Sequence, residues 1–454
     1  MIILPFLSAA LFVVQGQGSK SNYGQIVQHP NPNNGYEDYL RASDIAQGYQ
    51  CATLISWYPN ESAQLLASKH EMTDPAGNVA SDWTPEDEAM LALSKQLDQL
   101  GYLGVRKRLS DQFGGVVSLV KTGNQKAVWD PRTQLDASTV FPEFAGFKSV
   151  AKLIAEDSYV RFSEGDSRDG TDDLLQGYTF AEKIGGHNLI SELVSIACRS
   201  IMLAEFETEL PRLSDADAKE IIKYTDSALT DSGGLARAWK SEREQTLANI
   251  PVIFEHPDVF SGDDLPAGFQ DFLTKMSGGD RQAAANAIAQ GYGSFFDKLE
   301  ARLGGDESTW AKADPDSTLP PMPKSVNSVQ DVTDVMLNMM LPTFDPSVTA
   351  ELRSRAQLRL LGLHARIIDF RWKNGRLPKT LAEAVPKKLL FDPMSGGEFE
   401  YRITDDGGYK LHSNGVKGSG PIELKYKRPP GQSSSGDDQG IPPPLPGPIS
   451  VPAS

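Results

Sequence analysis

The sequence predicts a mainly α-helical protein in which an array of antiparallel helices is followed by a small α+β domain. Apolar residues recur every three or four positions over most of the first 313 residues, which is typical of amphipathic helices. A proline-rich stretch at 315–323 interrupts this pattern, and beyond it a long helical segment leads into two short runs of alternating apolar and polar residues. Apolar residues make up 39% and charged residues 23% of the 454 residues, a balance typical of a water-soluble body.

The first part of the helical body, which spans 19–313, contains one sharp helix signal. An opening helix is expected over 36–57 from its apolar spacing. The run Thr84-Pro85-Glu86-Asp87 then places a capping hydroxyl, a proline in the first turn and an acid three residues on. A helix of about four to five turns should therefore follow Thr84. Glycine pairs and prolines in 113–139 predict an irregular insert that includes one short strand.

In the second part of the body, the apolar spacing predicts helices joined by short turns that contain glycine. Such turns make neighbouring helices antiparallel. Gly165 and the Gly185-Gly186 pair separate the first three of them. The expected helices of this part lie at 150–162, 172–184, 187–209, 214–229, from 234 onward, and 280–303.

A linker that contains prolines and one short helix is expected at 314–346, followed by an α+β domain at 347–428. The domain opens with a long helix over 347–373, continues with a short helix near 380–384, and then forms two strands near 399–403 and 409–412. Residues 429–454 are rich in Pro, Ser, Gly and Asp and carry too little apolar surface to order, so they predict a disordered tail.

The apolar run at the start of the chain resembles a cleavable leader. Residues 1–14 are apolar, and the small residues of 15–18 offer a cleavage site, so 1–18 are interpreted as a secretory signal peptide. The run is shorter than the roughly 20 residues of a spanning helix, and no Cys follows it to carry lipid. The expectation is an exported protein, periplasmic or extracellular, without a stable membrane anchor after cleavage.

Charge and motif content exclude several classes of function. The net charge of -16 repels phosphate backbones, so nucleic acid is not an expected partner. The chain contains no Gly-rich phosphate loop after a strand and no Gly-x-Ser-x-Gly elbow, and the run His70-Glu71-Met72-Thr73-Asp74 lacks the second histidine of a zinc protease. The sequence therefore predicts no cofactor and no bound metal.

Cys51 and Cys198 are the two cysteines of the chain. They exclude a thiolate zinc site and allow at most one disulfide. Both lie in segments expected to be helical, and Cys198 stands among apolar residues, where an inert buried thiol is the alternative to a disulfide. An oxidising compartment favours pairing, and the sequence leaves the two outcomes open.

A succession of short motifs after the long helix looks like the globular end of the major pseudopilins of type II secretion systems. It also resembles tails of uncharacterised exported bacterial proteins with helical bodies. The motifs are Asn374-Gly375-Arg376-Leu377-Pro378, Asp392-Pro393-Met394-Ser395-Gly396 and Gly408-Tyr409-Lys410-Leu411-His412. The resemblance covers roughly 352–420 and implies a fold without an activity.

The chain departs from the pseudopilin pattern in two respects. Pseudopilins begin with a glycine-terminated leader and a long apolar stem, whereas the leader here is of secretory type and the pilin-like unit lies at the far end. In the last loop, Lys417 stands where the family has an acidic calcium ligand. An ammonium group cannot coordinate a hard cation, so no calcium is expected there.

Other charged groups are interpreted as structural. The acidic patch at 166–173 is interpreted as the solvent-exposed start of a helix, where the helix dipole favours negative side chains. Glu205, Glu207 and Glu209 alternate along a helix, so they point in different directions and do not form a carboxylate pair. Glu242 beside Arg243 is either a buried polar anchor or part of a surface pair, and the surface pair is the expectation. His364, in the long helix, is expected to be a packed histidine.

The first functional hypothesis is a non-enzymatic structural or interaction protein of the cell envelope, with a possible envelope protein partner that docks through 347–428. The alternative is a periplasmic hydrolase whose catalytic residues are dispersed over the helical body, which spacing rules cannot detect. A third possibility is small-molecule binding between the helices, which a deep cleft with converging polar groups would indicate.

Overall fold

The computed structural model describes residues 21–73, 83–132, 139–230, 233–255, 265–305, 307–310, 320–340, 344–405, 408–415 and 420–424. The expected signal peptide, the Pro-rich tail and Lys417 lie outside these residues.

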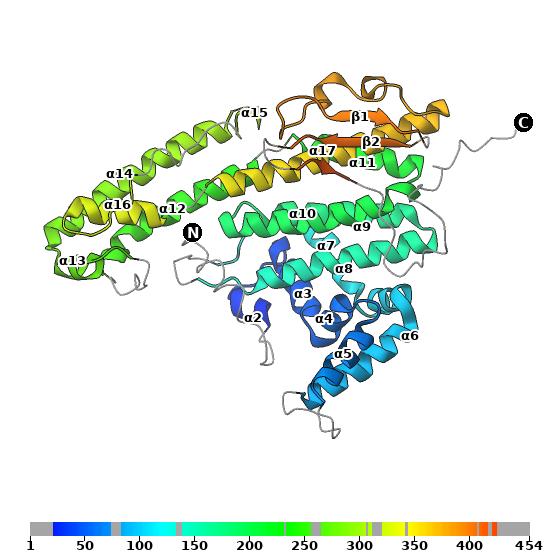
Figure 1. Ribbon diagram of the computed structural model, residues 1–454, viewed down its shortest axis with the longest axis horizontal. Coiled ribbons are helices and arrows are strands. Elements are labelled where there is room, and N and C mark those ends of the chain that lie inside the picture. The colour runs from blue at the N-terminus through cyan, green and yellow to red at the C-terminus, as the bar shows by residue number, and fades with distance from the viewer. Residues whose placement is uncertain are drawn as a thin grey trace, which may run out of the picture.

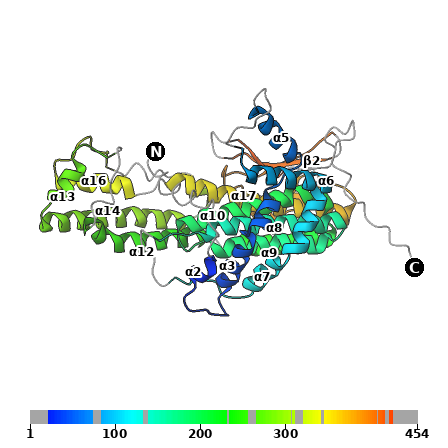
Figure 2. The ribbon, with the colours of Figure 1, turned by 90° about the horizontal axis from the view of Figure 1, so that it is seen from below.

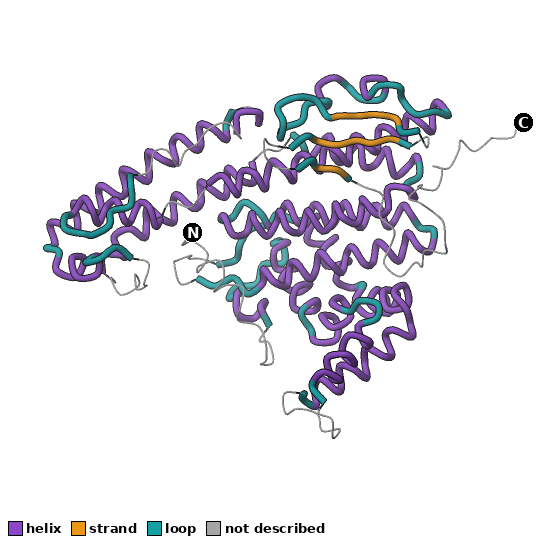
Figure 3. Tube along the Cα trace, viewed as in Figure 1, coloured by secondary structure: helices purple, strands orange, loops and turns teal. Residues whose placement is uncertain are grey.

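Over the described residues the protein is mainly helical and carries one small antiparallel sheet near the C-terminus, as expected (Figures 1 and 3). The helices of the N-terminal half are α2 (Asn22–Ile26), α3 (Gly35–Ala46), α4 (Tyr49–Ser56), α5 (Glu61–Glu71), α6 (Pro85–Phe113), α7 (Gly115–Asn124), α8 (Glu143–Glu164), α9 (Ser167–Ile184) and α10 (Leu189–Glu209). The later helices are α11 (Asp215–Ala228), α12 (Gly233–Glu255), α13 (Phe269–Lys275), α14 (Gly278–Leu303), α15 (Glu307–Trp310), α16 (Val329–Met340) and α17 (Phe344–Asn374).

Helix α6 begins at the predicted capping residue, Thr84. Thr84 accepts a hydrogen bond from the Asp87 backbone N–H while the Asp87 carboxylate accepts one from the Thr84 N–H, which is a reciprocal capping box. Gly101 has φ of 69°, so the helix is broken there after about four turns and resumes beyond it. The predicted length is therefore confirmed for the first of the two segments.

Two expectations for the N-terminal part are corrected. The opening helix is divided into α3 and α4, because Gln47 and Gly48 separate them. The described residues of 113–139 contain a helix in place of the expected strand, since α7 occupies Gly115–Asn124. Val116 and Val120 are fully buried against the rest of the core, and α7 packs on α3 and α9, so packing overrides the strand preference of its β-branched residues.

Helices α8, α9 and α10 pack against one another and form the centre of the body. Gly165 ends α8 in the left-handed conformation with φ of 88°, and Gly185 ends α9, so both predicted joints are confirmed. Gly177 of α9 permits the close approach of α10, because a Cβ at this position would lie 2.4 Å from Sδ of Met202. Figure 1 shows these long helices lying side by side.

Helices α12, α13, α14 and α16 extend away from this centre as an arm, visible in both views (Figures 1 and 2). Trp239 of α12 is fully buried and lies 5.6 Å, ring centre to ring centre, from Phe296 of α14. Arg243 forms ion pairs with Asp297 and Glu300 of α14. The expected pairing of Glu242 with Arg243 is thus wrong, because Arg243 reaches across to the neighbouring helix.

The C-terminal unit consists of α17, two 3-10 turns (Leu381–Glu383 and Lys387–Leu389) and the strands β1 (Glu400–Ile403), β2 (Tyr409–Ser413) and β3 (Ile422–Glu423). The strand order is β1-β2-β3 and both pairings are antiparallel, with Tyr401 opposite Leu411 and Ser413 opposite Ile422. The sheet packs on α17, where the buried His364 Nδ1 lies 2.7 Å from the Tyr409 hydroxyl. His364 is thus packed, as expected.

Helix α17 also packs along α11 and α10, so one hydrophobic core runs from the body into the C-terminal unit. Gly362 allows the closest contact with α11, because a Cβ there would lie 2.7 Å from Oγ1 of Thr225. One turn further on, Arg366 forms an ion pair of 2.6 Å with Asp226. These contacts fix the long helix to the body and place its first half beside α10.

Candidate functional site

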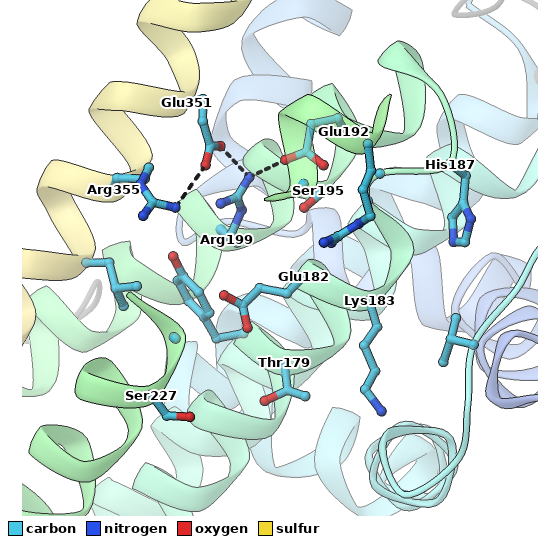
Figure 4. Close-up of a pocket in the computed structure, with 18 of the residues that line it drawn as sticks. Thr179, Glu182, Lys183, His187, Glu192, Ser195, Arg199, Ser227, Glu351 and Arg355 are labelled. Carbon is cyan, nitrogen blue, oxygen red and sulfur yellow. Dashed lines mark hydrogen bonds and ion pairs between the residues drawn. The ribbon is translucent and has the colours of Figure 1, made fainter. Parts of the chain in front are cut away.

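A polar pocket of about 600 Å³ lies where α9, α10, α12 and α17 meet (Figure 4). The end of α11 and residues 126–128, which follow α7, complete its wall. Five cationic side chains and three carboxylates are found among the described residues that line it. The cations are Lys126, Lys183, Arg199, Arg237 and Arg355, and the carboxylates are Glu182, Glu192 and Glu351.

Arg199 is the centre of the most buried part of this pocket. Its Nη2 donates to Glu192 at 2.7 Å and to Glu351 of α17 at 2.8 Å, and all three side chains are at least nine-tenths buried. Glu351 also lies 3.8 Å from Arg355, which pairs in turn with Glu307 of α15. A continuous ionic cluster therefore joins α10, α15 and α17.

Glycines shape the backbone around the Glu192 carboxylate. A Cβ on Gly185 would lie 2.5 Å from Glu192 Oε2, and one on Gly234 would lie 3.0 Å from the same oxygen. The Gly186 backbone N–H hydrogen-bonds to the carboxylate. Only residues without a side chain allow this approach, so the glycines that end α9 and open α12 also hold Glu192 in place.

Burial raises the pKa of Glu192 to about 7, and the nearby negative charge of Glu351 acts in the same direction, against the opposing effect of Arg199. Burial lowers the pKa of His187, so its imidazole is neutral at pH 7. The pocket thus holds a carboxyl group that titrates near neutrality beside an uncharged imidazole.

Several polar atoms of the pocket have no hydrogen-bond partner within the described part of the chain. They include Nε of Arg199, Oγ of Ser195 and Nε2 of His187. An unsatisfied buried polar group costs roughly 1–3 kcal/mol, so such groups are expected to meet water or a ligand. These atoms make the pocket the candidate site of the described residues.

The cationic side chains of the pocket differ in their partners. Lys126 pairs with Asp38 at 2.6 Å. Lys183 instead donates to two backbone carbonyl oxygens, those of Asn124 and Lys126. No carboxylate pairs with Lys183 among the described residues, and burial lowers its pKa. Figure 4 shows Lys183 and Arg199 pointing toward different parts of the pocket.

Cys51 and Cys198, the pair left open by the sequence, are both buried free thiols in the structure, in α4 and α10 respectively. No disulfide joins them in it. Burial raises the pKa of each thiol to about 12, so both are protonated at neutral pH and are poor nucleophiles. Neither cysteine lines the pocket.

The acidic patch at the start of α9 requires a correction. Asp166 caps the helix as expected, but Asp173 is fully buried and is not part of a solvated face. It pairs with Lys121 of α7 at 2.6 Å and with Arg161 of α8 at 2.5 Å. Burial raises its pKa to about 6. Cations from two neighbouring helices make this burial possible.

Glu207 and Glu209 of the acidic run in α10 are also buried, and Glu209 pairs with Arg212 at 3.1 Å. They do not form a joint site with the pocket residues. Sequence reasoning missed the pocket residues Glu192, Ser195 and Arg199 of the same helix. Glu192 and Arg199 are seven residues, or two turns, apart beside a strongly apolar face, and that spacing was the available signal.

No family model, curated protein or solved structure matches this chain. The described residues contain no group of three or more His, Cys, Asp or Glu side chains that could hold a metal ion. Across the same residues, no helix combines the length and the apolar character required to span a bilayer.

We expect the unfolding free energy to depend on pH through Glu209, because burial raises its pKa from the ordinary 4.5 to about 7. Between these two values the folded protein holds a proton that the unfolded chain releases, so stability falls as pH rises from about 4.5 to 7. The Glu209→Gln variant should lose this contribution, which is on the order of 3 kcal/mol. Urea unfolding at pH 5 and pH 8 measures it, with Glu244→Gln, an exposed glutamate, as the control. Equal pH dependence in Glu209→Gln and the wild type would contradict the assignment.

Proposed function

We propose that this chain is a non-enzymatic binding protein that holds a small polar molecule in the pocket between α9, α10, α12 and α17. The observation that carries the proposal is the set of buried polar atoms without partners, on Ser195, His187 and Arg199, in a pocket of about 600 Å³. Small-molecule sites have volumes of roughly 300–1,000 Å³ and place a few polar groups so that they fix the ligand's orientation.

The arrangement supports binding better than catalysis. A serine nucleophile needs a base within hydrogen-bond reach, and the Ser195 hydroxyl has no hydrogen-bond partner among the described residues. Glu192 and Glu351 are both engaged by Arg199. Their role is therefore to hold the guanidinium and shape the wall of the pocket.

The cellular setting belongs to the same proposal. The apolar leader at 1–18 supports export to the periplasm or the exterior, and an envelope protein is proposed to dock on 347–428. A long helix with a three-stranded antiparallel sheet packed on it supports the pseudopilin-like interpretation. Ile403, at the end of β1, is 46% exposed and offers an apolar contact on the outer part of this unit.

A hydrolase is the second candidate, and one observation favours it. The pKa of Glu192 is raised to about 7, and its carboxylate and that of Glu351 lie within 2.8 Å of the same nitrogen. A carboxyl group with a raised pKa next to a second carboxyl group is the arrangement of a general acid with its partner. If the protein hydrolyses esters or glycosides, Glu192→Gln should abolish turnover of fluorogenic substrates. A binding protein shows no turnover in either form.

A thermal-shift screen with pooled small polar metabolites tests the binding function. At least one pool should raise the melting temperature of the wild-type protein, because a ligand that binds the folded state stabilises it. Ser227 is an exposed residue that lines the pocket. The variant Ser227→Trp should abolish the shift in melting temperature, because the indole ring would fill the entrance of the pocket. Ser200→Trp, on the exposed face of α10, should respond like the wild type. A shift that persists in Ser227→Trp, or no shift in any pool, would refute the proposal.

A further inference from the structure

Most of the cationic side chains around the pocket pair with carboxylates of the described residues. Arg199 and Arg355 are matched by Glu192, Glu351 and Glu307, with Arg359 also paired to Glu307 at 2.8 Å. Lys126 is matched by Asp38. Lys183 donates to the Asn124 and Lys126 carbonyl oxygens, and no carboxylate pairs with it among the described residues. A ligand's negative charge would neutralise this ammonium.

The two ends of the pocket offer different chemistry. In Figure 4 Lys183 points away from Arg199, so a charged group and a polar body can be bound at separate places. The ionic cluster uses Nη2 of Arg199, and its Nε has no hydrogen-bond partner among the described residues. The Ser195 hydroxyl and, in another part of the pocket, the neutral His187 can donate or accept a hydrogen bond (Figure 4).

A hydroxyl group both donates and accepts, so it suits a wall in which guanidinium donors alternate with carboxylate acceptors. Because the cluster of Arg199, Glu192 and Glu351 already pairs its charges internally, it does not require a second ion. The unmatched Lys183 ammonium, by contrast, favours an anionic group.

We propose that the pocket binds a small hydroxylated anion, with its carboxylate or phosphate group at Lys183 and its hydroxyl groups against Arg199, Glu192 and Ser195. This inference rests on the proposed binding function and adds the chemical class of the ligand. Sugar acids and sugar phosphates share this chemistry.

Four probes that share a hexose body test the proposal by isothermal titration calorimetry. They are glucuronate, glucose 6-phosphate, glucose and glucosamine, which differ in the charged group. At least one of the two anions should bind tenfold or more tightly than glucose and glucosamine. Which anion binds better distinguishes a carboxylate ligand from a phosphate ligand. Equal or tighter binding of glucose or glucosamine would overturn the proposal.

Single substitutions test which residues bind the anionic group and which bind the hydroxyl groups. Lys183→Gln should reduce the preference for the anion over glucose to threefold or less, because the matching charge is lost. Lys240→Gln, which removes an exposed lysine of α12 outside the pocket, should keep the full preference. Ser195→Ala should weaken all probes that bind by a similar factor. An unchanged preference in Lys183→Gln overturns the assignment of the anion to this residue.

The outcome also separates this inference from the function on which it rests. If the metabolite screen yields a ligand that Ser227→Trp excludes, but no anion binds preferentially, the binding function stands and the ligand class is wrong. If the screen itself yields no ligand, both fail.

Discussion

Replacing Arg199 with Met is expected to lower the free energy of unfolding by about 3–5 kcal/mol. The change removes the one guanidinium that Glu192 and Glu351 share, and it leaves two buried carboxylates facing each other. The loss should be larger at pH 8 than at pH 5, because Glu192, whose pKa burial raises to about 7, takes up a proton at the lower pH and so relieves the repulsion. Chemical denaturation followed by circular dichroism measures it.

The triple variant Arg199→Met, Glu192→Gln, Glu351→Gln distinguishes uncompensated charge from lost packing. It should recover more than half of the lost stability, because no buried ion remains without a partner. The control Arg168→Met, at an exposed position of α9, should change stability by less than about 0.5 kcal/mol. A triple variant no more stable than Arg199→Met would show that packing, not charge, accounts for the loss.

The second large effect is expected for Arg106→Met, again with a loss of about 3–5 kcal/mol. Arg106 is 1% exposed and donates to the carbonyl oxygens of Leu54 and Trp57, at 2.6 and 3.0 Å, at the C-terminal end of α4. Its Nε lies 2.9 Å from Glu156 of α8. The substitution therefore leaves both carbonyl groups without their donor, and it leaves the partly buried Glu156 carboxylate with only its hydrogen bond from Tyr102.

Two further variants make this prediction specific. Arg106→Lys should recover only part of the loss, because a single ammonium cannot reach three acceptors that a planar guanidinium meets in different directions. Lys107→Met removes the neighbouring cation and its exposed pair with Glu164 at 2.8 Å, and should cost less than about 1 kcal/mol. If Arg106→Lys is as stable as the wild type, a positive charge alone suffices at this position.

The helices could be predicted from the sequence wherever their ends carry a local signal. Thr84 and Ser214 form the capping boxes of α6 and α11, and Gly165 ends α8, so the chemistry that sets these ends lies within four residues. Helix α7 lacked such a signal. Its glycines and paired valines resemble a turn and a strand, and contacts with α3 and α9, distant in sequence, decide its structure.

The site could be predicted only in part, because its members come from separate elements. Glu192 and Arg199 lie on one helix, so their spacing in the sequence could have predicted their contact. Glu351 lies 152 residues beyond Arg199, and no local pattern links the two. The glycine pair at 185–186 was identified as a joint, but its contact with the Glu192 carboxylate depends on the position of α10. Likewise, Asp173 was assigned to solvent because its cationic partners belong to α7 and α8.

The separation of Arg199 and Glu351 along the chain also affects how the protein is made. At a synthesis rate of roughly 5–20 residues per second, about 8–30 s pass between the addition of Arg199 and that of Glu351. During this interval α10 and α11 exist without the helix that covers them, and the nascent chain presents an apolar surface with a half-built ionic cluster. The last quarter of the polypeptide thus acts as the closing piece of the body, and a chain that is released early lacks one wall of its pocket.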